Sequence, residues 1–125
     1  MWDRPVTILV VEDDLGIHEV LAEVLRDEGY STLSAYDGSQ ALQLAREKAV
    51  DLILLDLAIP GLPGVDVIRA LRADELTATT PIVVTSGFEG RLSPEDQRLV
   101  QGVLPKPFSL DDLLALVARA LDQRA

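Results

Sequence analysis

Five polar side chains, each at the end of an apolar run, could together carry out phosphate chemistry. Glu12 and Asp13 follow one run of branched residues, Asp56 follows another, and Ser86 and Lys106 come after later runs. Carboxylates are ligands for hard cations such as Mg²⁺, a hydroxyl group donates hydrogen bonds to phosphate oxygens, and an ammonium group binds anions. A carboxylate can also attack phosphorus and form an aspartyl phosphate. These residue types therefore suit transfer of a phosphoryl group to Asp56.

The acidic members of this set need a cation if they lie close together. Two carboxylates about 4 Å apart repel each other by roughly 4 kcal/mol near a protein surface. A Mg²⁺ ion removes this repulsion and keeps several waters when only one or two carboxylates bind it, which leaves room for a phosphoryl group. Lys106 is one of only two lysines among eleven basic residues, which indicates that a compact ammonium group is needed there.

Short apolar runs and helical patterns alternate along the chain and would position these side chains. Buried strands are expected at residues 7–11, 32–35, 51–56, 81–86 and 102–104. The expected inner faces of four helices are Ile17, Val20, Leu21, Val24 and Leu25; Ala41, Leu42, Leu44 and Ala45; Val65, Ile68 and Leu71; and Leu113, Leu114, Val117, Ala120 and Leu121. Ser93 and Pro94 predict the start of a short polar helix that extends to Val100.

This alternation of strands and helices predicts an α/β fold. Five strands separated by helices favour a parallel sheet with helices on both faces and right-handed connections. In such a sheet the carboxyl ends of the strands lie along one edge, which is where open α/β proteins bind their ligands. We therefore expect Glu12, Asp13, Asp56, Ser86 and Lys106 to meet at that edge.

Length, charge and composition limit the possible functions. A chain of 125 residues with 48% apolar content is the size of one domain, so a single domain over residues 1–125 with no output domain is expected. The net charge of −10 opposes direct binding to nucleic acid or to an anionic membrane. There is no cysteine, no apolar run of membrane-spanning length and no secretory leader pattern, so a cytoplasmic protein is expected.

Four segments together resemble a known family. ILVVEDD, DLILLDLAIPGLPG, PIVVTSG and PKPF, in this order and spacing, resemble the receiver domains of response regulators in bacterial two-component systems, the CheY-like family. The resemblance extends along essentially the whole chain. It implies a (βα)5 flavodoxin-like fold with strand order 2-1-3-4-5. It also implies a phosphorelay role, in which an aspartyl phosphate switches the affinity for a partner.

The resemblance assigns a role to each acidic residue. Asp56 matches the phosphoacceptor of the family and also a ligand of Mg²⁺. Asp13 matches the direct metal ligand, Glu12 the residue that holds the ion through water, and Ala58 the residue whose backbone carbonyl reaches the metal.

The resemblance also assigns the residues that contact the phosphoryl group. Lys106 matches the lysine of the family, and its bond to Pro107 is a candidate cis peptide. Ser86 matches the hydroxyl residue, because it lies five positions after Pro81, with Thr85 as the alternative.

The implied partners are proteins. A histidine kinase or a histidine phosphotransfer protein would donate the phosphoryl group, and a downstream protein or another domain of the parent protein would read it. A homodimer through the face between the fourth and fifth helices is a further option. Because the chain catalyses only its own phosphorylation and dephosphorylation, it is not expected to be an enzyme with turnover.

Several positions depart from the family pattern. Val103 replaces the tyrosine or phenylalanine that usually changes orientation on activation, and Pro63 should stiffen the loop after Asp56. The segment from Ser86 to Lys106 is slightly short, so the fourth helix should be reduced. Ala58 and Phe88 offer no polar side chain to orient a hydrolytic water, which predicts a long-lived phosphoryl group.

Other interpretations remain open. Asp14 is expected to act as a helix cap, and His18, the only histidine, is expected to be a surface residue. The chain could keep the fold without the chemistry and act as a non-phosphorylated interaction module or a phosphate sink. A Mg²⁺-dependent phosphohydrolase of another α/β family is a third reading, although Ala58 stands where a second catalytic acid would be needed.

Overall fold

The fold is built around a parallel β-sheet. The computed structural model describes residues 4–87 and 91–123. Within these residues the sheet has five strands in the order β2-β1-β3-β4-β5, as predicted. The strands are β1 (Thr7–Val11), β2 (Ser31–Ala35), β3 (Leu52–Asp56), β4 (Ile82–Ser86) and β5 (Gly102–Pro105). Their bounds differ from the predicted ranges by one residue at most, because apolar branched runs form the buried strands.

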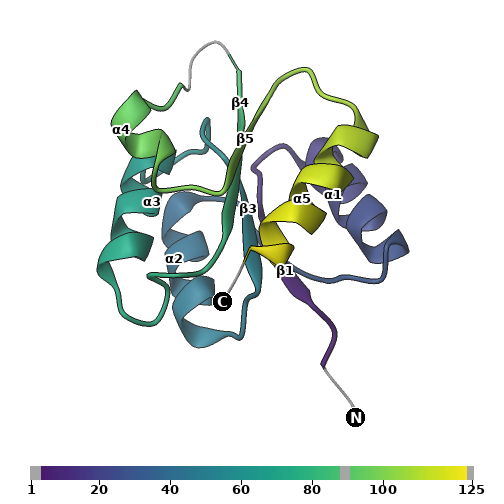
Figure 1. Ribbon diagram of the computed structural model, residues 1–125, viewed down its shortest axis with the longest axis horizontal. Coiled ribbons are helices and arrows are strands. Elements are labelled where there is room, and N and C mark those ends of the chain that lie inside the picture. The colour runs from purple at the N-terminus through teal and green to yellow at the C-terminus, as the bar shows by residue number, and fades with distance from the viewer. Residues whose placement is uncertain (1–3, 88–90, 124–125) are drawn as a thin grey trace.

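Helices cover both faces of the sheet (Figure 1). They are α1 (Leu15–Asp27), α2 (Gly38–Glu47), α3 (Gly64–Ala73), α4 (Pro94–Gln97) and α5 (Leu110–Asp122). Helices α1 and α5 lie on one face, and α2, α3 and α4 lie on the other (Figure 1). The described part of the chain therefore has the parallel α/β arrangement that the alternating pattern predicts and the flavodoxin-like strand order that the resemblance implies.

The sheet divides the core into two apolar layers. Alternate residues of β1 point to opposite sides, so Leu9 packs with α2 and α3, whereas Ile8 packs with α1 and α5. All five residues of β3 are buried, including Asp56 at its end. Because β3 is covered on both faces, it fixes the position of that carboxylate at the carboxyl end of the sheet.

Side chains cap the helices at the positions that the sequence indicates. The carboxylate of Asp14 accepts a hydrogen bond from the backbone N–H of Ile17, which confirms its predicted role. The hydroxyl groups of Ser93 and Ser109 accept equivalent bonds at the starts of α4 and α5. Gly29 follows α1 with a φ of 96°, a conformation that favours glycine.

The inner face of α1 differs from the prediction. Ile17 and Val20 are 45% and 49% exposed, whereas His18 is buried. The face that meets the sheet consists of His18, Leu21, Ala22 and Leu25, which lie at positions i, i+3, i+4 and i+7 of the helix. The prediction of a surface histidine was therefore wrong. The choice of Ile17 and Val20 as core residues was also wrong, because the buried face of α1 is centred on His18 and Leu21 instead.

Helix α4 is short, as the length of the segment from Ser86 to Lys106 suggested, and side chains of α3 form hydrogen bonds with it. The prediction extended it to Val100, but the α-helix ends at Gln97. Arg69 of α3 forms two hydrogen bonds with the buried Asp96 of α4, the shorter being 2.9 Å. The guanidinium group of Arg72 donates to the backbone carbonyl of Leu99 at 2.8 Å.

Arg72 also ties this region to the segment before β4. Its Nη1 donates to the backbone carbonyls of Thr77, Ala78 and Thr80. Burial lowers the pKa of Arg72, but the hydrogen bonds to carbonyl groups replace the lost contact with water.

No helix in the described parts of the chain combines the length and the apolar character that a bilayer crossing requires.

Candidate functional site

Asp56 is held by two hydrogen bonds at the end of β3. Its Oδ1 accepts the backbone N–H of Ala58 at 3.0 Å, and its Oδ2 accepts a hydrogen bond from Lys106 Nζ at 2.8 Å. The residue is 5% exposed. A carboxylate so enclosed is oriented by its neighbours rather than by water, which suits a nucleophile that must meet an incoming group in one direction.

Three carboxylates come together at this edge of the sheet. One oxygen each from Glu12, Asp13 and Asp56 lies within 4.8 Å of the other two, although the residues come from two strand ends. Lys106 Nζ lies 4.0 Å from Glu12 Oε1, so this ammonium group is shared between Glu12 and Asp56. One lysine does not balance three carboxylates, and the cluster keeps an excess of negative charge.

The pKa of Glu12 reflects its burial first and this excess of charge second. Burial and the neighbouring Asp56 together raise the pKa of Glu12 from 4.5 to about 7, against the effect of a hydrogen bond from the backbone N–H of Asp14. The same cause predicts that a cation near these oxygens would favour the ionised form. The donor set consists only of hard oxygen ligands, one of them exposed to solvent, and therefore fits Mg²⁺.

Lys106 reaches the acidic cluster because β5 is fixed to β4. Its backbone N–H donates to the carbonyl of Ser86 at 2.7 Å, one step beyond the strand pair Ser86 and Pro105. The peptide bond from Lys106 to Pro107 is cis, as predicted.

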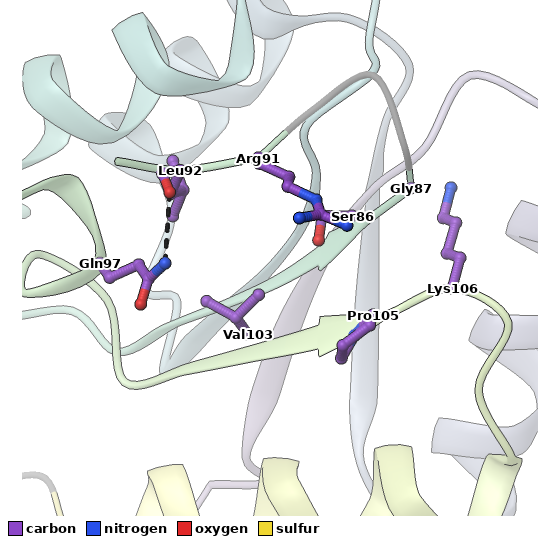
Figure 2. A pocket seen from close by; sticks show the side chains of 8 residues that line it. All are labelled: Ser86, Gly87, Arg91, Leu92, Gln97, Val103, Pro105 and Lys106. Carbon is purple, nitrogen blue, oxygen red and sulfur yellow. Dashed lines mark hydrogen bonds between the residues drawn. The ribbon is translucent and has the colours of Figure 1, made fainter. Parts of the chain in front are cut away.

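Ser86 and Thr85 are both buried at the end of β4. Thr85 is the register partner of Asp56, and Ser86 is the next residue. Ser86 lines a cavity of about 270 Å³ together with Lys106, and Figure 2 shows both at the rim of the sheet. This placement is compatible with the choice of Ser86, and its contact with a phosphoryl group stays a prediction.

The sequence pattern missed His18 as a neighbour of the cluster. Its Nδ1 lies 2.9 Å from the carbonyl oxygen of Glu12, and its Nε2 lies 2.8 Å from Ser34 Oγ. Because a carbonyl only accepts, Nδ1 must carry a proton in this arrangement. The ring also stacks on Tyr36, with centroids 4.6 Å apart. Its spacing of three and seven residues from Leu21 and Leu25 was the signal for an inward position.

The loop after Asp56 packs against the start of α2. The backbone N–H of Gly38 donates to the carbonyl of Pro60 at 3.4 Å, and Gly61 has a φ of 76°. Pro63 occupies the cap position of α3 without a side-chain hydrogen bond. Ala58 is exposed, and the role of its carbonyl stays a prediction. Phe88 lies outside the described residues.

Comparison with known proteins decides the family. The model of the response regulator receiver domain matches residues 8–118. The chain belongs to this family. Receiver domains are phosphorylation-dependent switches of two-component systems, and the fold and the predicted family membership are both confirmed.

Relatives and solved structures agree with this assignment. The DNA-binding response regulator MtrA of Mycolicibacterium smegmatis is 46% identical over 121 residues, which cover 91% of this chain and 50% of MtrA. This receiver chain thus spans about half the length of that relative. Sporulation initiation phosphotransferase F of Bacillus subtilis is 34% identical, with coverage of 91% of this chain and 92% of that protein.

A solved receiver domain supports the metal assignment. The receiver domain of sensor histidine kinase PA1611 from Pseudomonas aeruginosa has a magnesium ion coordinated in its active-site cleft. It superposes with a TM-score of 0.86 at 29% identity, and the match covers 96% of this chain and 100% of that one. Receiver domains bind Mg²⁺ in the active site, and the acidic cluster of this chain has the oxygen ligands for it.

Proposed function

We propose that Asp56 accepts a phosphoryl group from the phosphohistidine of a histidine kinase or a histidine phosphotransfer protein. The observation that carries this proposal is the 2.8 Å contact between Lys106 Nζ and Asp56 Oδ2 within the three-carboxylate cluster. A structural carboxylate at a strand end would not need two acidic neighbours, whose repulsion opposes folding.

The transfer is a displacement at phosphorus. One carboxylate oxygen of Asp56 forms a bond to phosphorus while the bond from phosphorus to the donor imidazole nitrogen breaks. The electron pair of that bond stays on the imidazole nitrogen. No further reactant is needed, and most of the catalysis is positioning and charge stabilisation. The hydrogen bonds from Ala58 and Lys106 supply the positioning of the nucleophile.

The acidic residues would hold Mg²⁺, with Asp13 and Asp56 as direct ligands, Glu12 as a ligand through water and the Ala58 carbonyl as a backbone ligand. When bound, the ion neutralises the charge that gathers on the phosphoryl oxygens. Asp13 is the exposed member of the cluster, so it is the residue open to an ion arriving from solvent.

Lys106 and Ser86 would hold the product. Lys106 is a point charge already placed beside the acceptor oxygen, and a hydroxyl group at Ser86 can donate to a phosphoryl oxygen. The phosphorylated state would then change the affinity of the opposite surface for a downstream protein or a further domain of the parent protein. The chain would modify itself once per cycle and would not turn over a substrate.

Phosphorylation by a small donor tests the proposal. Incubation with acetyl phosphate and Mg²⁺ should add one phosphoryl group to the wild type, measured by intact mass. Asp56→Asn should abolish the adduct. Asp27→Asn, at an exposed carboxylate on α1, should leave it unchanged and serves as the matched control. Absence of the adduct from the wild type, or its presence in Asp56→Asn, would contradict the proposal.

A second function keeps the fold and drops the phosphorylation. Val103 and the four-residue α4 favour it, because the usual aromatic readout is missing. A pure interaction module should show no Mg²⁺-linked change in amide chemical shifts at Glu12 and Asp13. The complete acidic cluster and its lysine favour phosphorylation instead.

A further inference from the structure

A cavity of about 270 Å³ lies beside the candidate phosphorylation site, between β5 on one side and Arg91 and Leu92 on the other (Figure 2). Its polar lining includes Ser86, Arg91 and Lys106, and its apolar lining includes Leu92, Val103 and Pro105. The side chain at position 103 has no ring to fill this space. Two cationic side chains and one hydroxyl group therefore border one opening at the edge of the sheet.

Arg91 is available to a ligand. It forms neither an ion pair nor a hydrogen bond with any residue of the described ranges 4–87 and 91–123, and it is exposed. Lys106, in contrast, already contacts Asp56 and Glu12. In Figure 2 the side chain of Arg91 extends from its segment over the cavity on the side of Ser86.

Phosphorylation increases the demand for positive charge at this edge. An acyl phosphate carries nearly two negative charges, whereas the carboxylate it replaces carries one. Lys106 already contacts two carboxylates of the three-carboxylate cluster before the group arrives, so it cannot neutralise the added charge alone. A guanidinium group binds phosphate oxygens with two parallel hydrogen bonds, a geometry that an ammonium group does not offer.

We propose that Arg91 is a second cation of the phosphoryl site, which binds the oxygens of the phosphoryl group on Asp56 from the side opposite to Lys106. This inference rests on the proposed function, because it concerns the same phosphoryl group. It adds a residue that the family motifs of this chain do not include.

The position of Arg91 in the chain links this contact to α4. Leu92, the next residue, is buried in the apolar layer below α2 and α3, and Ser93 caps α4. Ser93 Oγ also donates to Asp96 Oδ2 at 3.0 Å, and Asp96 in turn pairs with Arg69. A displacement of Arg91 toward the phosphoryl group would therefore shift the first turn of α4, with no need for an aromatic residue at position 103.

Binding of beryllofluoride, a small mimic of the phosphoryl group, tests the inference in the presence of Mg²⁺. Arg91→Gln should weaken binding by about tenfold, because a charge-assisted hydrogen bond is lost, and Arg91→Lys should have a smaller effect. Isothermal titration calorimetry gives the dissociation constants. Arg98→Gln is the matched control, since Arg98 is an exposed arginine at the end of α4 and does not line the cavity.

Amide hydrogen exchange at Asp96 and Gln97 provides a second measurement. The mimic should slow exchange there in the wild type and in Arg98→Gln but not in Arg91→Gln. Equal affinities of all variants, or equal losses in Arg91→Gln and Arg98→Gln, would overturn the role of Arg91 alone. If the wild type itself fails to bind the mimic, the proposed phosphorylation fails and this inference fails with it.

Discussion

Replacing Glu12 by glutamine should stabilise the metal-free protein at neutral pH. Glu12 is 3% exposed, and burial raises its pKa from 4.5 to about 7. The folded state thus holds the proton more tightly than the unfolded state does. The stability that comes from protonated Glu12 is fully present below pH 4.5 and is lost as the pH rises through 7.

The size of this effect follows from the same pKa. A pKa raised from 4.5 to about 7 corresponds to about 3 to 4 kcal/mol of unfolding free energy. Because Glu12 of the unfolded chain is already largely ionised at pH 5, about 2 kcal/mol of this difference falls between pH 5 and pH 8. Glutamine has nearly the same shape, keeps an oxygen that can accept the N–H of Asp14, and carries no charge that must be buried.

Urea unfolding with a chelator present measures the difference. Between pH 5 and pH 8 the advantage of Glu12→Gln over the wild type should grow by about 2 kcal/mol. Glu23→Gln, an exposed residue on α1, should show a constant difference from the wild type. Parallel curves for Glu12→Gln and the wild type would refute the reasoning. Saturating Mg²⁺ should reduce the advantage at pH 8, because the ion would stabilise the ionised wild-type cluster.

Three further predictions concern the phosphoryl lifetime, the loop after Asp56 and helix α4. Ala58→Asn should shorten the half-life of the phosphorylated protein by at least about tenfold, since an amide can orient a water, and an unchanged decay would contradict this. Gly38→Ala should destabilise the protein by about 2 kcal/mol in urea unfolding, because its Cβ would overlap the loop backbone, whereas Gly16→Ala should be tolerated. Arg69 holds the pKa of Asp96 below its usual range, so protonation of Asp96 at low pH should break this ion pair and speed amide exchange in α4. Asp96→Asn should remove this dependence of exchange on pH, whereas Glu95→Gln, at an exposed neighbour, should keep it.

The acidic cluster was predictable because it depends on topology. Once the strands are known to be parallel, the residues after β1, β3 and β5 must share one edge, and Glu12, Asp56 and Lys106 do so. The sequence signal was strong because each of these polar residues ends an apolar run.

The predictions for α1 failed because apolar character did not coincide with burial there. Ile17 and Val20 are apolar and exposed, whereas His18 is polar and buried because the carbonyl of Glu12 and the hydroxyl of Ser34 satisfy its ring nitrogens. Helical spacing can indicate that His18 points inward, but it cannot identify the partners of the ring, since Ser34 belongs to β2. Burial of a polar side chain depends on a tertiary hydrogen bond that only the folded chain provides.

The arginines of α3 have a consequence for how this domain can be recognised. Arg69 binds Asp96 within α4, and Arg72 binds the carbonyl of Leu99 just after it, so α4 and the turn that follows are both attached to α3. A four-residue helix alone offers a partner only a small surface, whereas α3 and α4 held together offer a larger continuous surface. Partner selectivity should therefore be encoded in side chains of α3 as much as in those of α4, and exchanging one helix between related domains without the other should disrupt recognition.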